Sequence, residues 1–188
     1  MIHTPYRFES SFSPEEFQRF GQFAVRWSHI EHTIANCLRV MLNFDPKQAS
    51  VMIYPLSLDT RMARIGERIK LIPLQPEQMV LFEELKPLIR AMQYLRNTVF
   101  HGTLVDLFSS DEPFWHLRSK DRTVTKSQLF GCEELVNYTC HITEAFRLSL
   151  GGKGDDREQP YTLPDRPLIP DFLPDECRAF PKAAKAKT

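Results

Sequence analysis

The chain has 188 residues, of which 42% are hydrophobic and 26% are charged, and its formal net charge is zero. This length suits one domain with an appendage, and the composition is that of a globular protein with a sizeable core. A net charge of zero gives the whole molecule no electrostatic attraction to nucleic acid or to a membrane. Any nucleic-acid site therefore has to be a local patch of basic residues.

Cysteine spacing and the N-terminal residues indicate the compartment. Cys37, Cys132, Cys140 and Cys177 form no C-x-x-C pair, so neither a zinc knuckle nor a redox motif is indicated. The segment MIHTPYRFES lacks the basic and apolar parts of a signal peptide. No run approaches the ~18 apolar residues that span a bilayer. We therefore expect a cytoplasmic protein with reduced thiols, no membrane partner, no metal and no cofactor.

The first helix is predicted from its cap and from its apolar spacing. Ser13 is expected to cap it, Pro14 to take its first position and Glu16 to complete a capping box. Apolar side chains then recur every three or four residues until the helix ends near Asn43. Residues 1–12 are interpreted as an N-terminal arm.

Three further helices follow the same helical spacing. Two are predicted over residues 46–54 and 57–72, and a longer one begins near Pro76. Pro87 lies inside this longer helix and should kink it. Gly102 is placed to end it in the left-handed conformation.

After Gly102 the pattern changes from helical to β-rich. The segments TLVDLF, FWHLR and TVT predict a small hairpin or meander. A last helix is then predicted from Thr125 or Ser127 to Gly151. The expected fold is all-α: an antiparallel bundle of four to five helices over residues 13–150, with a small β-hairpin inserted before the last helix.

The remaining residues, 151–188, differ in composition from the rest of the chain. They hold six of the 14 prolines and show neither a helical nor a strand period. Such a segment is predicted to be an extended or disordered tail that becomes ordered only when it docks on a surface.

The stretch YLRNTVFHG holds the candidate catalytic residues of the sequence. Arginine binds phosphate with two parallel hydrogen bonds, and histidine takes and gives protons near neutral pH. Together Arg96 and His101 could cleave RNA without a metal ion. His101 would take the proton from a ribose 2′-hydroxyl, Arg96 would stabilise charge on the phosphorane, and Asn97 would support either group.

Helix geometry limits this interpretation. Arg96 and His101 lie about 140° apart on an ideal helix. Their side chains converge only if the helix ends at His101 or if two copies of the chain pair across an axis, and Gly102 favours the first arrangement. The alternative is an ordinary helix end, at which His101 caps carbonyl groups and Arg96 is solvated.

The motif RNTVFHG at a helix end resembles the signature of the HEPN superfamily, in which four to six residues separate an arginine from a histidine. The order of elements over residues 13–150 resembles that of many HEPN-like proteins. The resemblance implies an all-α bundle that forms a homodimer, with both Arg–His pairs facing a shared cleft. Many members are metal-independent RNases of toxin or defence systems, and others are non-catalytic. Toxins paired with minimal nucleotidyltransferases often carry Tyr where this chain has Thr103, so that class is not favoured.

Charged residues on two helices are further candidates. Glu31 lies on an apolar stripe, where a carboxylate needs a partner. It either orients the Arg96–His101 pair or forms a structural ion pair with Arg61 or Arg64. Arg61, Arg64 and Arg68 could contact an RNA backbone, or they could be solvated or bridge to acidic neighbours.

Two functions follow from these residues and from the resemblance. The first is a metal-independent endoribonuclease of a toxin or defence system, acting on RNA as a homodimer and controlled by an antitoxin or another protein partner. The second is a non-catalytic dimeric module that binds a protein or a nucleotide.

Overall fold

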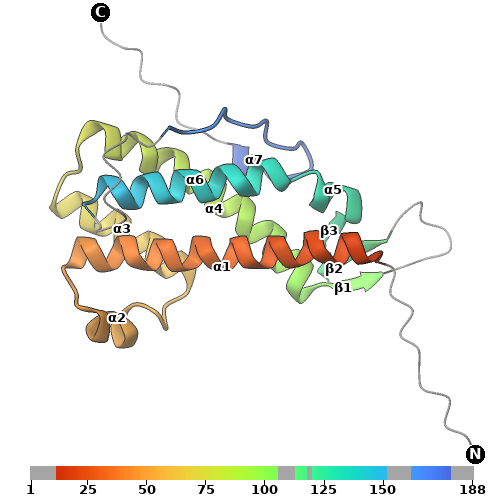
Figure 1. Ribbon diagram of the computed structural model, residues 1–188, viewed down its shortest axis with the longest axis horizontal. Helices are drawn as coiled ribbons and strands as arrows, with labels where there is room; N and C mark the ends of the chain where they lie inside the picture. The colour runs from red at the N-terminus through yellow and green to blue at the C-terminus, as the bar shows by residue number, and fades with distance from the viewer. Residues whose placement is uncertain (1–11, 106–112, 118–119, 152–161, 179–188) are drawn as a thin grey trace, which may run out of the picture.

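The structure is a computed structural model that describes residues 12–105, 113–117, 120–151 and 162–178. Its three long helices, α1 (Pro14–Leu42), α4 (Pro76–His101) and α6 (Glu133–Ser149), lie side by side, and α4 runs opposite to the other two (Figure 1). This arrangement confirms the predicted helical bundle with a small inserted sheet. The other elements are α2 (Pro46–Met52), α3 (Leu58–Leu71), β1 (Thr103–Val105), β2 (Phe114–Leu117), β3 (Arg122–Thr125), α5 (Lys126–Phe130) and α7 (Asp175–Arg178).

Helix α1 begins and ends where its sequence predicts. The Ser13 hydroxyl accepts a hydrogen bond from the Glu16 amide at 3.2 Å, and the Glu16 carboxylate accepts one from the Ser13 amide at 2.7 Å. These contacts satisfy amide groups that have no partner within the helix. Asn43 ends the helix in the left-handed conformation, with φ of 54°.

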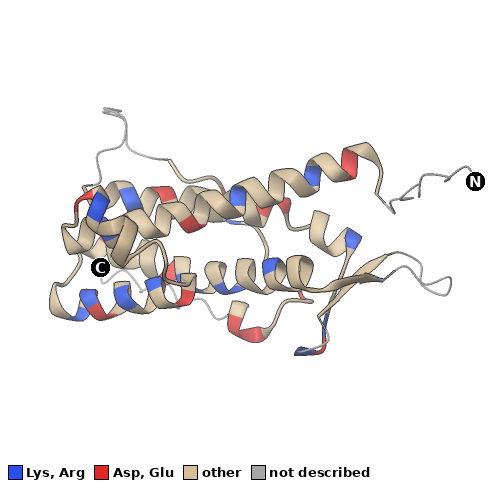
Figure 2. Ribbon diagram, turned by 90° about the horizontal axis from the view of Figure 1, so that it is seen from below, with Lys and Arg blue, Asp and Glu red and all other residues tan. Residues whose placement is uncertain are grey.

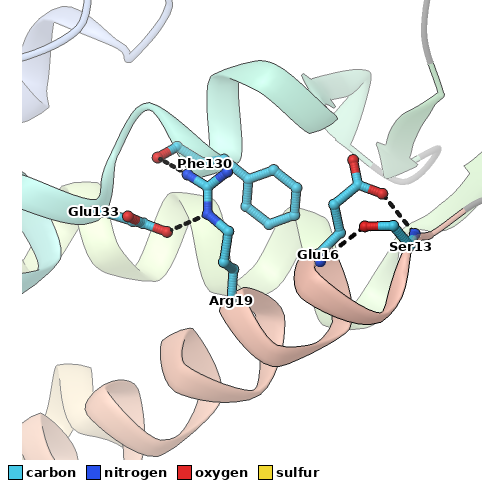
Figure 3. A network of polar contacts seen from close by, with 5 residues as sticks. All are labelled: Ser13, Glu16, Arg19, Phe130 and Glu133. Carbon is cyan, nitrogen blue, oxygen red and sulfur yellow. Dashed lines mark hydrogen bonds and ion pairs between the residues drawn. The ribbon is translucent and has the colours of Figure 1, made fainter.

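Arg19 joins α1 to the corner between α5 and α6 (Figure 3). Its Nε donates to Glu133 Oε1 at 2.6 Å, its Nη2 donates to the Phe130 carbonyl at 3.3 Å, and its guanidinium lies 4.3 Å from the centroid of the Phe130 ring. Because Arg19 and Glu133 are partly solvated, the pair contributes at most about 1 kcal/mol to stability. Its geometry fixes where α5 and α6 meet α1.

The segment predicted as one last helix is two helices. Thr125 caps α5 and forms a capping box with Gln128. Gly131 and Cys132 then separate α5 from α6, and the Cys132 amide donates to the Leu129 carbonyl at 3.1 Å, which is a tighter turn than an α-helix makes. Glycine is a weak helix former, and the break lets Cys132 become fully buried.

The inserted β-segment is a three-stranded antiparallel meander in the order β1-β2-β3. Its central strand pairs Trp115 with Leu104 on one side and with Val124 on the other. Trp115 is buried and its ring centroid lies 6.2 Å from that of Phe20 on α1. The sheet is thereby attached to the end of the bundle where α1 begins and α4 ends (Figure 1).

The described part of the tail, residues 162–178, is packed against the bundle. It has no regular structure until the short helix α7, which lies against α4 and which the sequence did not predict. Leu173 and Cys177 are almost completely buried, so these two apolar side chains dock the segment. The arm at residues 1–11 and residues 152–161 and 179–188 lie outside the described part. None of the described helices is long and apolar enough to cross a membrane.

An ion pair on α6 predicts a pH-dependent contribution to stability. Arg147 Nε donates to Glu144 Oε2 at 2.8 Å, and this hydrogen bond lowers the pKa of the Glu144 carboxyl below its usual value of 4.5. A lowered folded-state pKa stabilises the fold at higher pH, and the contribution is lost as the pH falls through that pKa. We expect Glu144→Gln to lower the free energy of unfolding by about 0.5–1 kcal/mol at pH 7, and by much less near pH 3.

Urea unfolding at both pH values measures this difference. Glu67→Gln is the matched control, because Glu67 forms an i,i+3 pair with Arg64 at 3.0 Å with both side chains mostly exposed. It should change stability less at pH 7. An equal loss for Glu144→Gln at pH 3 and pH 7 would show that the ion pair is not the cause.

Candidate functional site

The last turn of α4 brings Arg96, Asn97 and His101 together within one chain. Arg96 Nη1 lies 2.7 Å from His101 Nε2 and 3.1 Å from Asn97 Oδ1. Arg96 and Asn97 are half-buried and His101 is exposed. Their side chains converge, as predicted for a helix that ends at His101, and no second copy is needed for this contact.

The protonation of His101 in this arrangement follows from the chemistry of its partner. A guanidinium group has donors only, so His101 Nε2 must accept the hydrogen bond from Arg96. The imidazole is then neutral and carries its proton on Nδ1; this tautomer is inferred from the partner. The ring therefore presents to the arginine the same lone pair that a general base would use.

Gly102 connects this site to the sheet, and here the sequence prediction of a left-handed cap is wrong. Gly102 is extended, with φ of −79° and ψ of 159°, a conformation open to any residue. A Cβ atom there would collide with the Thr98 carbonyl oxygen and lie 3.2 Å from backbone atoms of His116. Glycine is thus required because the Thr98 carbonyl of α4, and to a lesser degree the backbone of β2, occupy the space of a Cβ atom, and not because of its φ angle.

Buried neighbours hold the end of α4 in place. Leu95 and Val99 are buried in the core, and the fully buried Thr98 donates its hydroxyl to the Tyr94 carbonyl at 2.8 Å. The Gly102 amide donates to the Thr98 carbonyl at 2.9 Å. The backbone that carries the site is therefore set by core packing, while the functional groups themselves reach solvent.

Phe100 is a residue of this site that the sequence interpretation missed. Its ring lies 5.3 Å from that of Phe20 and 6.3 Å from that of Phe23, both on α1. The Arg96 guanidinium lies 6.0 Å from its centroid. Phe100 is 41% exposed, so it also offers an aromatic surface beside the arginine. Its place four residues after Arg96, one helical turn, is the signal that could have found it.

Glu31 is not brought into this site by any contact among the described residues. α1 and α4 are antiparallel, and Phe23 packs on Phe100. Glu31 is a further eight residues along α1, a distance of about 12 Å. Its backbone carbonyl accepts a hydrogen bond from Arg61 Nη1 at 3.1 Å. That bond does not involve the carboxylate, so the predicted roles of this carboxylate stay predictions.

The three arginines of α3 have different surroundings. Arg61 is buried and donates to the carbonyls of Ile53 and Tyr54 as well as Glu31, and Arg68 Nε donates to the Met41 carbonyl at 3.1 Å. These bonds tie α3 to α1 and to the residues that end α2, which favours structural roles for both residues. Arg64 is exposed and pairs with Glu67, so it remains the one candidate of the three for contact with RNA.

The charges of the described helices do not gather on one face. Lys and Arg alternate with Asp and Glu along the ribbons (Figure 2). This mixture agrees with the zero net charge. Attraction of an RNA phosphate to the site therefore depends on single Lys or Arg side chains that have no acidic partner, and not on a broad basic surface.

Comparison of the chain with protein-family models, with curated proteins and with solved structures found no match.

Proposed function

We propose that this protein is a HEPN-like, metal-independent endoribonuclease that cleaves RNA at a composite site in a homodimer, within a toxin or defence system. The observation that supports the proposal most is the contact of 2.7 Å between Arg96 and His101 at the exposed end of α4. It places a proton acceptor and a phosphate-binding group next to each other.

The proposed reaction uses the ribose of the substrate as the nucleophile. When the phosphate draws Arg96 away from His101, the freed Nε2 takes the proton of a 2′-hydroxyl. The O2′ atom bonds to the adjacent phosphorus, and the bond from phosphorus to the 5′-oxygen breaks. The products are a 2′,3′-cyclic phosphate and a 5′-hydroxyl. Arg96 stabilises the negative charge on the phosphorane oxygens, and Asn97 holds the guanidinium through its Oδ1.

The departing 5′-oxygen needs a proton, and a single imidazole cannot accept one and donate another in the same step. A second His101, from another copy of the chain, supplies that acid in the proposed homodimer, where it acts as the protonated imidazolium released from its own Arg96. An exposed face of α1, away from the Phe20 and Phe23 contacts with Phe100, offers apolar surface for such contact. It carries Phe17 and Val25, which are 52% and 70% exposed, and Gly21, above which there is open space.

Removal of Arg96 tests the phosphate-binding role. With purified protein, EDTA and a mixture of tRNA and other RNA, we expect Arg96→Ala to lower the cleavage rate by about 10²–10³-fold, since it removes a positioned donor from the transition state. Lys47→Ala, at an exposed residue of α2, removes one positive charge elsewhere and should cleave at the parental rate. Equal rates for Arg96→Ala and the parent would contradict the assignment.

A non-catalytic HEPN-like module that binds a partner protein, such as an antitoxin, or a nucleotide is the second candidate. It is favoured by the same contact, because Arg96 and His101 already satisfy each other and can be a stable helix end. The same assay separates the two functions. An absence of His101-dependent cleavage across the RNA mixture would favour the binding module.

A further inference from the structure

A groove of about 280 Å³ lies between α3 and α4. Lys86, Arg90 and Gln93 line it from α4, and Asp59 and Met62 line it from α3. Helix α3 packs on α1, and Gln93 Nε2 bridges the groove to Asp59 Oδ1 at 2.8 Å. The groove therefore combines polar and apolar lining residues, among them Ile89 and Ala63, from two different helices.

The α4 wall of the groove is continuous with the candidate site. Lys86, Arg90, Gln93, Asn97 and His101 follow one another at steps of three or four residues. On an ideal helix these five positions fall within an arc of about 80°. Arg90 precedes His101 by 11 residues, a distance of about 16 Å along the axis. A chain molecule bound at His101 could thus continue along the same stripe into the groove.

The charges of the groove point to an anionic occupant at Arg90. Lys86 is paired with Glu83 at 2.6 Å. Arg90 is exposed and has no ion pair among the described residues. The acidic residue of the lining, Asp59, is held by a hydrogen bond from the neutral amide of Gln93 and not by Arg90, so the Arg90 guanidinium stays available. A guanidinium in this position matches the geometry of a phosphate group.

We infer that this groove binds the phosphate backbone of a single RNA strand that extends from the scissile bond, with Arg90 as its main phosphate ligand; the inference rests on the proposed RNase function. A distance of about 16 Å spans roughly five nucleotides at a stacked spacing of ~3.4 Å. Met62 contributes an apolar surface for a ribose or a base.

Cleavage of RNAs of different length tests the inference. A substrate with one fixed cleavage position is extended by one to eight nucleotides on either side. For the parental protein we expect kcat/KM to rise with extension on one side up to about five nucleotides. Arg90→Ala should remove that rise, roughly tenfold for the longest substrate, and leave the shortest substrate unaffected. Lys47→Ala is the control for the lost charge.

Two results separate this inference from the proposed function. If the parent cleaves with dependence on His101 and Arg90→Ala behaves like the parent at every length, the groove assignment is overturned and the function stands. If no RNA is cleaved, the proposed function falls. In that case, fluorescence anisotropy measures the binding of labelled RNA of 15 nucleotides to His101→Ala protein and tests whether the groove binds RNA. Adding Arg90→Ala should reduce the salt slope of binding by about 0.7, and an unchanged slope overturns the assignment.

Discussion

Substitution of His101 by alanine is expected to abolish RNA cleavage and to leave the protein folded. His101 is exposed, and among the described residues its side chain hydrogen-bonds to Arg96 alone, so its removal takes little from the core. It does remove the group that accepts the proton of the 2′-hydroxyl, which lowers the rate by about 10²–10⁴-fold for a general base. Initial rates on the RNA mixture, measured beside urea unfolding curves, give both quantities.

His29→Ala is the matched control for this change. His29 is an exposed histidine on α1, and its replacement is expected to leave the rate unchanged. A His101→Ala protein that cleaves as fast as the parent would refute the acid–base role. A protein that loses both activity and its unfolding transition would show that His101 is needed for folding instead.

The second large effect is expected at Gly102, where alanine should destabilise the whole domain. The added Cβ would collide with the Thr98 carbonyl and press on the backbone of His116. Both neighbours are main-chain atoms that cannot rotate away, so residue 102 must move away from the last turn of α4 and from strand β2. We expect the free energy of unfolding to fall by about 3 kcal/mol, measured by urea denaturation.

Gly66→Ala is the control for the Gly102 substitution. A Cβ at Gly66, inside α3, would meet no atom within 4 Å. Alanine there should stabilise the protein by about 0.5–1 kcal/mol, because glycine is a poor residue in a helix interior. If Gly102→Ala were as stable as the parent, the close approach of β1 and β2 at the site would be in doubt.

The features that the sequence predicted well depend on neighbours in the chain. The capping box of Ser13 and Glu16 involves residues three apart, and the apolar spacing of α1 reports one face of one helix. The contact between the Arg96 and His101 side chains could also be predicted, because it depends only on the residue at which α4 ends. Local rules decided these features because the contacts that make them are local.

The features that the sequence did not predict depend on contacts between distant segments. The need for glycine at position 102 follows from how close the Thr98 carbonyl and the backbone of β2 come to it. Arg61 donates hydrogen bonds to three backbone carbonyl groups, which lie close to one another only after α1, α2 and α3 pack together. The docking of Leu173 on the bundle needs the assembled core. A single sequence shows residue types at these positions but not what they touch.

The chemical ends of the RNA products test the central claim most directly. A purified oligonucleotide that the parent cleaves in EDTA is analysed by mass spectrometry. Attack by the 2′-hydroxyl under the action of His101 and Arg96 leaves a 2′,3′-cyclic phosphate on one fragment and a 5′-hydroxyl on the other. We expect these ends, and we expect them to be absent with His101→Ala. Fragments that carry a 3′-hydroxyl and a 5′-phosphate, or cleavage that occurs only with a divalent metal, would contradict the account.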